Sequence, residues 1–145
     1  MSQSHCTLAF PLKSPAGAKA VAQELPPLMP DLFQAEDAIG TVHYSRFTVL
    51  SERTLLFLAD FDGEFGTLMV DLAKRAGKAF DAVLKHVNEP PPGPVSNNAD
   101  AFAEWAAEHL LWRILWYCWR RTNKHPQALS GDEKRSDFHE GQSPR

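Results

Sequence analysis

Hydrophobic and polar residues alternate with a period of two in several short stretches of this chain. That period is the signature of a strand with one buried face. The clearest case is the stretch 40–65, "GTVHYSRFTVLSERTLLFLADFDGEF", which reads as two strands joined by a tight loop. A further strand is predicted on each side of this hairpin. The pattern predicts strands over residues 6–13, 41–50, 54–61 and 112–119.

The segments between the strands carry helix signals. Ser14 followed by Pro15 is a typical helix start, and this first helix ends near Leu25 because Pro26 and Pro27 cannot continue it. Apolar residues at helical spacing predict two more helices, over 64–87, with a break at Gly77 as an alternative to one continuous helix, and over 98–110. Residues 26–40 are predicted to form an irregular connector with room for one helical turn. Residues 88–98 are predicted to form a rigid, extended linker.

The aromatic stretch that follows residue 110 allows two interpretations. One long helix over 98–120 would place tryptophans on every side, which requires a membrane or a large partner. A strand buried on both faces accommodates the same residues more simply, so 112–119 is predicted as a strand. Residues 123–145 are polar and rich in turn formers, which predicts a disordered tail after a single domain over 1–122.

The order of these elements is strand, helix, strand, strand, helix, helix, strand. This order predicts an α+β fold of the ferredoxin-like type, with a four-stranded antiparallel sheet and helices on one face. Right-handed crossovers place the first and third strands side by side in the middle of the sheet. The other face carries apolar residues without helices to cover them. A second copy, packed sheet on sheet, is therefore expected, and the protein is predicted to be a homodimer.

Length and composition agree with one globular domain. The chain has 145 residues, of which 43% are hydrophobic and 23% are charged, enough to bury a core without staples. A formal net charge of -3 gives no electrostatic footprint for nucleic acid. The two cysteines show neither metal-ligand nor disulfide spacing, and no signal peptide or membrane-spanning run is found. We expect a soluble cytoplasmic protein without nucleic-acid or membrane partners.

Four ionisable residues lie along the apolar hairpin. A three-residue loop over 51–53 would pair Leu50 with Thr54, and this register assigns each side chain to a face. The open face then holds Tyr44, Arg46, Thr48, Leu56, Leu58 and Asp60. The side toward the helices holds His43, Ser45, Phe47, Val49, Leu55, Phe57, Ala59 and Phe61. Unless a bulge intervenes, His43 and Arg46 therefore point to opposite sides.

Each ionisable residue of the hairpin has a structural interpretation beside a functional one. Arg46 and Asp60 are diagonal neighbours, which predicts an interface ion pair rather than a clamp for a substrate carboxylate. His43 is predicted to be a hydrogen-bonded histidine of the core or its rim rather than a haem or metal ligand. Asp62 is predicted to cap the following helix, with Gly63 allowing the turn. No metal site, nucleophile motif or phosphate-binding loop is found in the sequence.

Three quoted stretches carry a resemblance to a known family. "GTVHYSRFTVL", "LLFLADFDGEFGTLMVDLA" and "FDAVLKHV" resemble a group of small bacterial ferredoxin-like proteins of the dimeric α/β-barrel superfamily. The helix "AFAEWAAEHL" and the aromatic strand "ILWYCW" also resemble the C-terminal part of that group. The likeness covers roughly residues 6 to 120, and several barrel relatives handle haem or are monooxygenases. The last strand, "WYCWRRTNKHP", is more basic and richer in tryptophan than the family pattern.

Two functional classes stay open on this basis. The absence of a catalytic constellation favours a dimeric ferredoxin-like module without a cofactor, non-catalytic or accessory to another protein. The resemblance implies the alternative, a haem- or small-molecule-binding enzyme related to peroxidases or monooxygenases, with a pocket at the sheet. The candidate residues for a pocket or an interface are His43, Tyr44, Arg46, Asp60, Asp62 and Tyr117.

Overall fold

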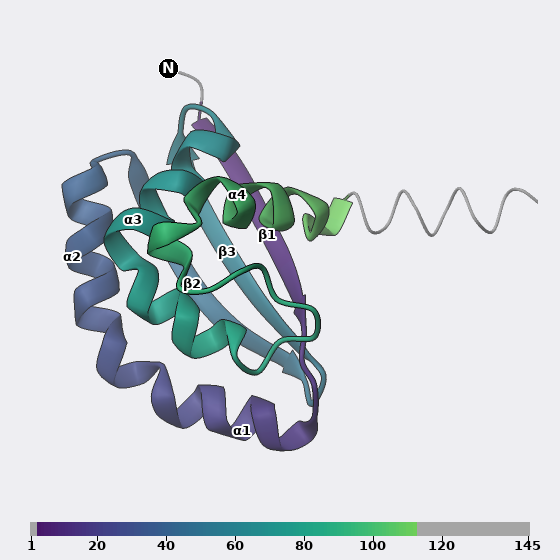
Figure 1. The fold of residues 1–145 in the computed structure, drawn as a ribbon. Helices are drawn as coiled ribbons and strands as arrows, with labels where there is room; N and C mark the ends of the chain where they lie inside the picture. Colours follow the sequence, from purple (N-terminus) through teal and green to yellow (C-terminus); the bar gives the residue numbers. More distant parts are fainter. Residues whose placement is uncertain (1–2, 113–145) are drawn as a thin grey trace, which may run out of the picture.

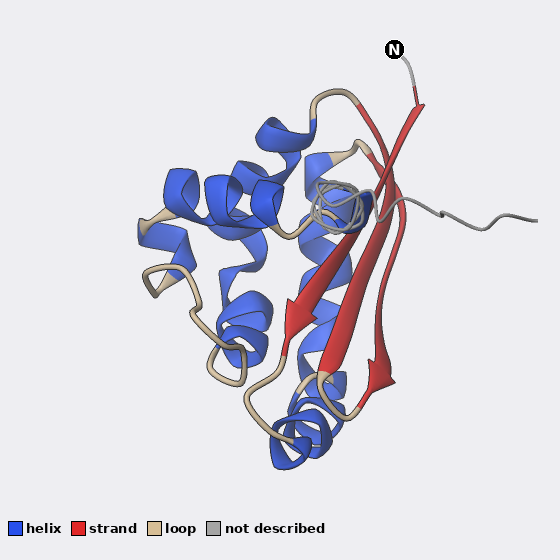
Figure 2. Cartoon of the chain, turned by 90° about the vertical axis from the view of Figure 1, so that its right-hand side faces the viewer, coloured by secondary structure: helices blue, strands red, loops and turns tan. Residues whose placement is uncertain are grey.

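The computed structural model describes residues 3–112, which form an α+β fold with one antiparallel sheet and helices against one of its faces. The three strands are β1 (Gln3–Pro11), β2 (Val42–Ser51) and β3 (Thr54–Asp62). The sheet order is β1-β3-β2, so β3 is the central strand (Figure 1). Figure 2 shows the strands as one layer and most of the helices as a second layer on one side of it.

The register of the hairpin agrees with the sequence over most of its length. Tyr44 pairs with Asp60 and Val49 pairs with Leu55, as predicted. At the turn, Ser51 rather than Leu50 pairs with Thr54, because the register shifts between Val49 and Ser51. The predicted neighbourhood of the first and third strands is also confirmed, since β1 pairs with β3 along its whole length.

The predicted fourth strand falls almost wholly outside the described residues. The chain reaches the outer edge of β1 at one antiparallel bridge between Leu8 and Leu110, where the Ala9 N–H donates to the His109 carbonyl oxygen at 2.9 Å. Trp112, the last described residue, has helical rather than extended backbone. Over residues 3–112 the sheet therefore has three strands, and the four-stranded ferredoxin-like topology stays a prediction.

The helices are α1 (Pro15–Glu24), α2 (Met29–Ile39), α3 (Phe65–Leu84) and α4 (Ala99–Glu108). Helix α1 begins as predicted, because the Ser14 hydroxyl accepts a hydrogen bond from the Gly17 N–H at 3.2 Å. Helix α2 corrects the sequence analysis, which expected an irregular connector there. Pro30 lies in its first turn, where no N–H has to be donated, and the helix buries Leu32 on the core side.

The predicted break in the third helix lies next to the predicted linker, and the two segments pack against each other. Ala76 has non-helical backbone angles and kinks α3 directly before Gly77. A Cβ atom at Gly77 would lie 3.2 Å from the Ser96 Cβ atom, so glycine permits this close approach. Val95 is fully buried, and its N–H donates to Asp81 Oδ1 at 3.0 Å. The end of segment 88–98, at Val95 and Ser96, is therefore packed against α3, so this segment is not a free extended linker.

The core lies between the sheet and the helices. It is filled by the side chains of β1 and β3 that face the helices, whose exposed fractions are at most 6%: Cys6, Leu8, Phe10, Leu55, Phe57, Ala59 and Phe61. Phe80 of α3 connects the layers, with ring centroids 5.4 Å from Phe57 and 5.2 Å from Phe102. None of the helices within residues 3–112 is long and apolar enough to cross a bilayer.

Candidate functional site

The open face of the sheet, which is the face away from the helices, holds most of the residues that the sequence marks as candidates. Tyr44 lies beside Asp60 on one side, and His5 lies beside Asp60 on the other, so these three residues form one row across the strands. Arg46 lies in the next row, opposite Leu58. The predicted open-face assignment of Tyr44, Arg46 and Asp60 agrees with this strand pairing.

His43 does not take its predicted position. The register shifts between Val42 and Tyr44, which marks a bulge in β2 at this point. His43 Nε2 lies 2.9 Å from Asp62 Oδ2, and half of the His43 side chain is exposed. The bulge therefore brings His43 to Asp62 and to the open face, away from the helix-facing side that strict alternation predicts.

Asp62 also differs from its prediction as a helix cap. Its carboxylate contacts His43, and the N-cap position of α3 is occupied by Glu64, whose side chain makes no capping hydrogen bond. The prediction for Gly63 is confirmed, because its φ of 99° lies in the left-handed region that glycine tolerates.

Asp60 has a different partner from the one that the sequence analysis assigned. His5 Nδ1 lies 2.6 Å from Asp60 Oδ1, whereas Arg46 forms no ion pair with any carboxylate of residues 3–112 within 4.0 Å. The cause is geometric, since His5 stands directly across from Asp60 and Arg46 stands only diagonal to it. His5 was missed because the hairpin sequence gives no register for β1. The alternation of His5 with Cys6 and Leu8, which are buried, could have placed His5 on the open face.

The open face thus carries two histidine–aspartate pairs, His5–Asp60 and His43–Asp62, two residues apart along the central strand. Within each pair the imidazole and the carboxylate are hydrogen-bonding partners. Both pairs are too exposed to contribute much to the stability of the fold. The described residues contain no group of three or more His, Cys, Asp or Glu side chains placed to hold a metal ion. The arrangement suits a polar rim beside a contact surface.

Apolar side chains also lie on this face, in the rows next to the two pairs. Leu56 and Leu58 are partly exposed there, and Tyr44 is 51% exposed. The side chains of Leu56 and Leu58 have no helix over them, because the helices pack against the other face. Tyr117, the remaining candidate residue, lies outside the described residues. This surface, defined by Tyr44, Leu56 and Leu58, is called the open apolar patch below.

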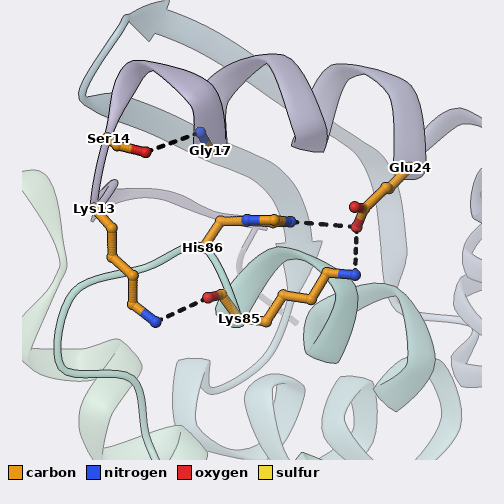
Figure 3. Close-up of polar contacts among 6 residues, drawn as sticks. All are labelled: Lys13, Ser14, Gly17, Glu24, Lys85 and His86. Atoms are coloured by element: carbon orange, nitrogen blue, oxygen red, sulfur yellow. Dashed lines mark hydrogen bonds and ion pairs between the residues drawn. The ribbon is translucent and has the colours of Figure 1, made fainter.

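A second polar cluster ties α1 to the end of α3 (Figure 3). Glu24 Oε2 lies 2.5 Å from Lys85 Nζ and 3.3 Å from His86 Nε2, and Lys13 Nζ donates to the Lys85 carbonyl oxygen at 2.9 Å. The hydrogen bonds from Lys85 and then from His86 lower the pKa of Glu24. These groups satisfy one another between two elements, so the cluster serves as a structural clamp.

A buried polar pair links α2 to β2. The Ser45 hydroxyl donates to Glu36 Oε1 at 2.5 Å, and both residues are 7% exposed. Burial is the main reason that the pKa of Glu36 is raised; the Ser45 hydrogen bond opposes this effect, and the charge of Asp37 adds to it. Glu36 is not among the predicted candidates, because residues 26–40 have the pattern of an irregular connector. In β1, burial raises the pKa of the Cys6 thiol to about 11, which makes this cysteine a poor nucleophile.

A groove of about 360 Å³ lies between α1, α2 and β2, beside the buried pair. Its lining includes Leu25, Met29, Phe33 and Phe47, together with Ser45 and Arg46. This groove opens at the β2 edge of the sheet. The pocket at the sheet that the haem-binding alternative implies stays a prediction.

Comparisons with known proteins identify no family for this chain. No protein-family model, no curated protein and no solved structure matches it. The resemblance to dimeric α/β-barrel proteins therefore stays a prediction from short sequence patterns. What the structure supports is a small α+β fold with a three-stranded antiparallel sheet and helices.

Proposed function

We propose that this protein is a non-catalytic, ferredoxin-like module that forms a homodimer through the open face of its sheet, as dimeric α/β-barrel proteins do. The observation that carries the proposal is the open apolar patch. Helices cover only one face of the sheet, while Tyr44, Leu56 and Leu58 stay partly exposed on the other. A soluble module with such a face needs a partner for it, and a second copy supplies a matching surface.

The proposal includes a fourth strand over 112–119 beside β1. The bridge between Leu8 and Leu110 supports it, because the chain is already antiparallel to β1 at that point. The outer edge of β1 would otherwise offer unpaired backbone groups next to His5. A fourth strand would widen the sheet and extend the surface that a second copy covers.

The histidine–aspartate pairs are compatible with burial beside this contact. A carboxylate that loses water without a partner is strongly destabilising, whereas one that keeps a hydrogen-bond partner is less so. Asp60 and Asp62 each have an imidazole within 2.9 Å. Both carboxylates can therefore lie at the edge of a dimer contact while their hydrogen bonds persist.

The test compares Leu58→Glu with Ala38→Glu by light scattering at micromolar concentration. Both variants add one negative charge, but Leu58 lies in the open apolar patch and Ala38 is exposed on α2. We expect a dimer for the wild type and for Ala38→Glu, and a monomer for Leu58→Glu, because the new carboxylate would lose its water in the contact, and the facing Arg46 would not fully offset that cost of several kcal/mol. Circular dichroism controls for folding. A monomeric wild type contradicts the proposal.

The haem alternative implied by the resemblance is tested with the same preparation. Absorbance spectra recorded with and without haemin are expected to show no protein-bound haem band. A stoichiometric band that is lost in His43→Ala or His5→Ala would favour a haem-binding protein instead, since neutral imidazole is a common ligand of haem iron.

A further inference from the structure

A second groove, of about 760 Å³, is formed by α2, by α3 around its kink, and by the segment that holds Pro94 and Ser96. Helices α2 and α3 run side by side in Figure 1. Ala76 and Gly77, the two residues at the kink, are part of the lining. The volume falls within the roughly 300–1,000 Å³ range of ligand pockets. The groove is therefore large enough for a small molecule.

Three cationic residues from one short stretch of α3 line this groove, namely Lys74, Arg75 and Lys78, and all three are exposed. Lys78 follows Lys74 by four positions and Arg75 by three, and these spacings place side chains on the same side of a helix. All three line the same groove although the kink lies among them. The chain as a whole has a formal net charge of -3. The groove is therefore a local concentration of positive charge on a protein that is negative overall.

The three cations have N–H donors left for a ligand. None of them forms an ion pair within 4.0 Å with a carboxylate of residues 3–112. Lys85, which directly follows α3, is by contrast held by Glu24. Like charges at helical spacing repel each other. An anion that contacts more than one of the three cations would relieve this repulsion and gain a charge-assisted hydrogen bond from each cation.

Two carboxylates also line the groove, but each has a role in its own part of the fold. Asp81 Oδ1 accepts a hydrogen bond from the Val95 N–H at 3.0 Å, which holds this segment against α3. Asp31 lies in the first turn of α2, where the helix dipole favours a negative charge. With three cations against two carboxylates, the lining favours an anionic ligand over a cationic one.

The charges and the apolar part of the lining define the class of anion. A phosphoryl group carries about two negative charges near neutral pH and several acceptor oxygens, so it can contact more than one cation at once. Arginine contacts a phosphate through two parallel N–H groups, and lysine contacts it as a point charge. Leu28, Leu32 and Ala38 line the same groove, which suits an apolar group attached to the phosphate.

We propose that this groove binds a small phosphate monoester with an apolar group. Lys74, Arg75 and Lys78 hold the phosphoryl group, and the apolar group lies against α2. This inference does not rest on the proposed dimer, because the groove lies among the helices, whereas the open apolar patch lies on the face of the sheet away from them.

Phenyl phosphate serves as the probe, and binding is measured by calorimetry and by thermal shift on the full chain. Benzoate and benzylamine carry a carboxylate or an amine in place of the phosphate, and inorganic phosphate lacks the ring. Lys78→Gln tests the cations, with Lys19→Gln as the control, because Lys19 is exposed on α1 outside the groove. Ala38→Glu and Leu58→Glu add the same charge to the groove and to the open apolar patch, respectively.

We expect phenyl phosphate to bind the wild type, Lys19→Gln and Leu58→Glu with equal affinity. Lys78→Gln should bind it about tenfold more weakly, the loss typical of a charge-assisted hydrogen bond. Ala38→Glu should also weaken binding, because the new carboxylate repels the phosphate. Inorganic phosphate, benzoate and benzylamine should all bind the wild type more weakly than phenyl phosphate does.

The proposal is overturned if the wild type does not bind phenyl phosphate at millimolar concentration, if any of the three other ligands binds as tightly, or if Lys78→Gln retains full affinity. Circular dichroism of each variant controls for folding. Light scattering of Ala38→Glu and Leu58→Glu reports the oligomeric state separately, so a failure of this inference and a failure of the proposed dimer are distinguishable.

Discussion

The two faces of the central strand β3 both carry leucine side chains, but these side chains have very different surroundings. Side chains at the odd positions point to the helices, and Leu55, Phe57 and Phe61 are at most 1% exposed. Side chains at the even positions, such as Leu56 and Leu58, stay partly exposed. Leucine thus appears on both faces within one strand. The helix-facing leucine is already used for the core of the monomer, and its neighbours on the open face are available to a partner.

Carboxyl groups follow the same division. Glu36, on the helix side, is buried with a single hydroxyl as its partner, and its pKa is raised. Asp60, on the open face, remains partly exposed with an imidazole as its partner. The helix side of the sheet therefore disfavours a charged carboxylate, whereas the open face accommodates one. Three predictions test how sharp this contrast is.

The largest effect is expected from a matched pair of leucine substitutions in β3. Leu55→Ala removes a buried side chain that is 1% exposed, which should lower the free energy of unfolding by about 2–5 kcal/mol. Leu56→Ala removes the neighbouring side chain on the open face and should cost about 1 kcal/mol or less in the monomer. Urea denaturation of both variants at low protein concentration measures the difference.

Protein concentration makes this comparison informative about assembly. If the open face is covered by a second copy, the cost of Leu56→Ala should grow with protein concentration, because dissociation then accompanies unfolding. The cost of Leu55→Ala should grow much less. Equal costs for the two substitutions at every concentration would remove the contrast between the faces.

Local sequence patterns were sufficient for β1, β2 and β3, for the helices α1, α3 and α4, and for most of the hairpin. The register from Tyr44 to Val49 follows from strict alternation, and the start of α1 at Ser14 follows from capping chemistry. The kink beside Gly77 was accessible as an interruption of helical spacing. Each of these features is decided by residues close together in the chain, which is why the sequence alone predicts them.

The errors arise where distant residues decide the structure. His43 was assigned to the wrong face because a bulge, which no local pattern signalled, brings it to Asp62. Asp60 was paired with Arg46 because the register of β1 against β3 depends on long-range packing. Helix α2 was missed because Pro26 and Pro27 marked the end of the preceding helix and the residues after them read as a connector, whereas Pro30 lies in the first turn of α2, where no N–H is needed.

An intermediate effect is expected from Glu36→Gln, which tests the intolerance of the helix side for charge. The folded-state pKa of Glu36 lies above its ordinary value of 4.5, so the folded protein binds more protons between these two values and loses stability as the pH rises through this interval. Glutamine keeps an acceptor for the Ser45 hydroxyl and carries no charge. We expect the variant to be more stable than the wild type at pH 7, by a gain on the order of 1 kcal/mol, and equally stable near pH 4.

Thermal denaturation over this pH range measures the effect, with Glu52→Gln in the exposed hairpin loop as the control. The control should show no gain at pH 7, since its carboxylate is already solvated. A Glu36→Gln variant that is less stable than the wild type at pH 7 would show that the buried carboxylate is a favourable part of the core, and the contrast between the faces would then fail for charge.

The smallest effect is expected on the open face, from a double-mutant cycle of His5→Ala and Asp60→Ala. The two atoms lie 2.6 Å apart, but the side chains are 69% and 41% exposed, so water and salt screen their attraction. The coupling free energy should be about 0.2–1 kcal/mol at low salt and should decrease as salt is added. Urea denaturation at low protein concentration, where a dimer dissociates, measures the pair apart from the dimer contact. A coupling that rises only in the dimeric wild-type background would place the pair within the contact, because a hydrogen bond is stronger where water is excluded. A coupling of several kcal/mol in the monomeric background would instead mean that the open face is covered within a single chain, and the contrast between the two faces of β3 would no longer require a partner.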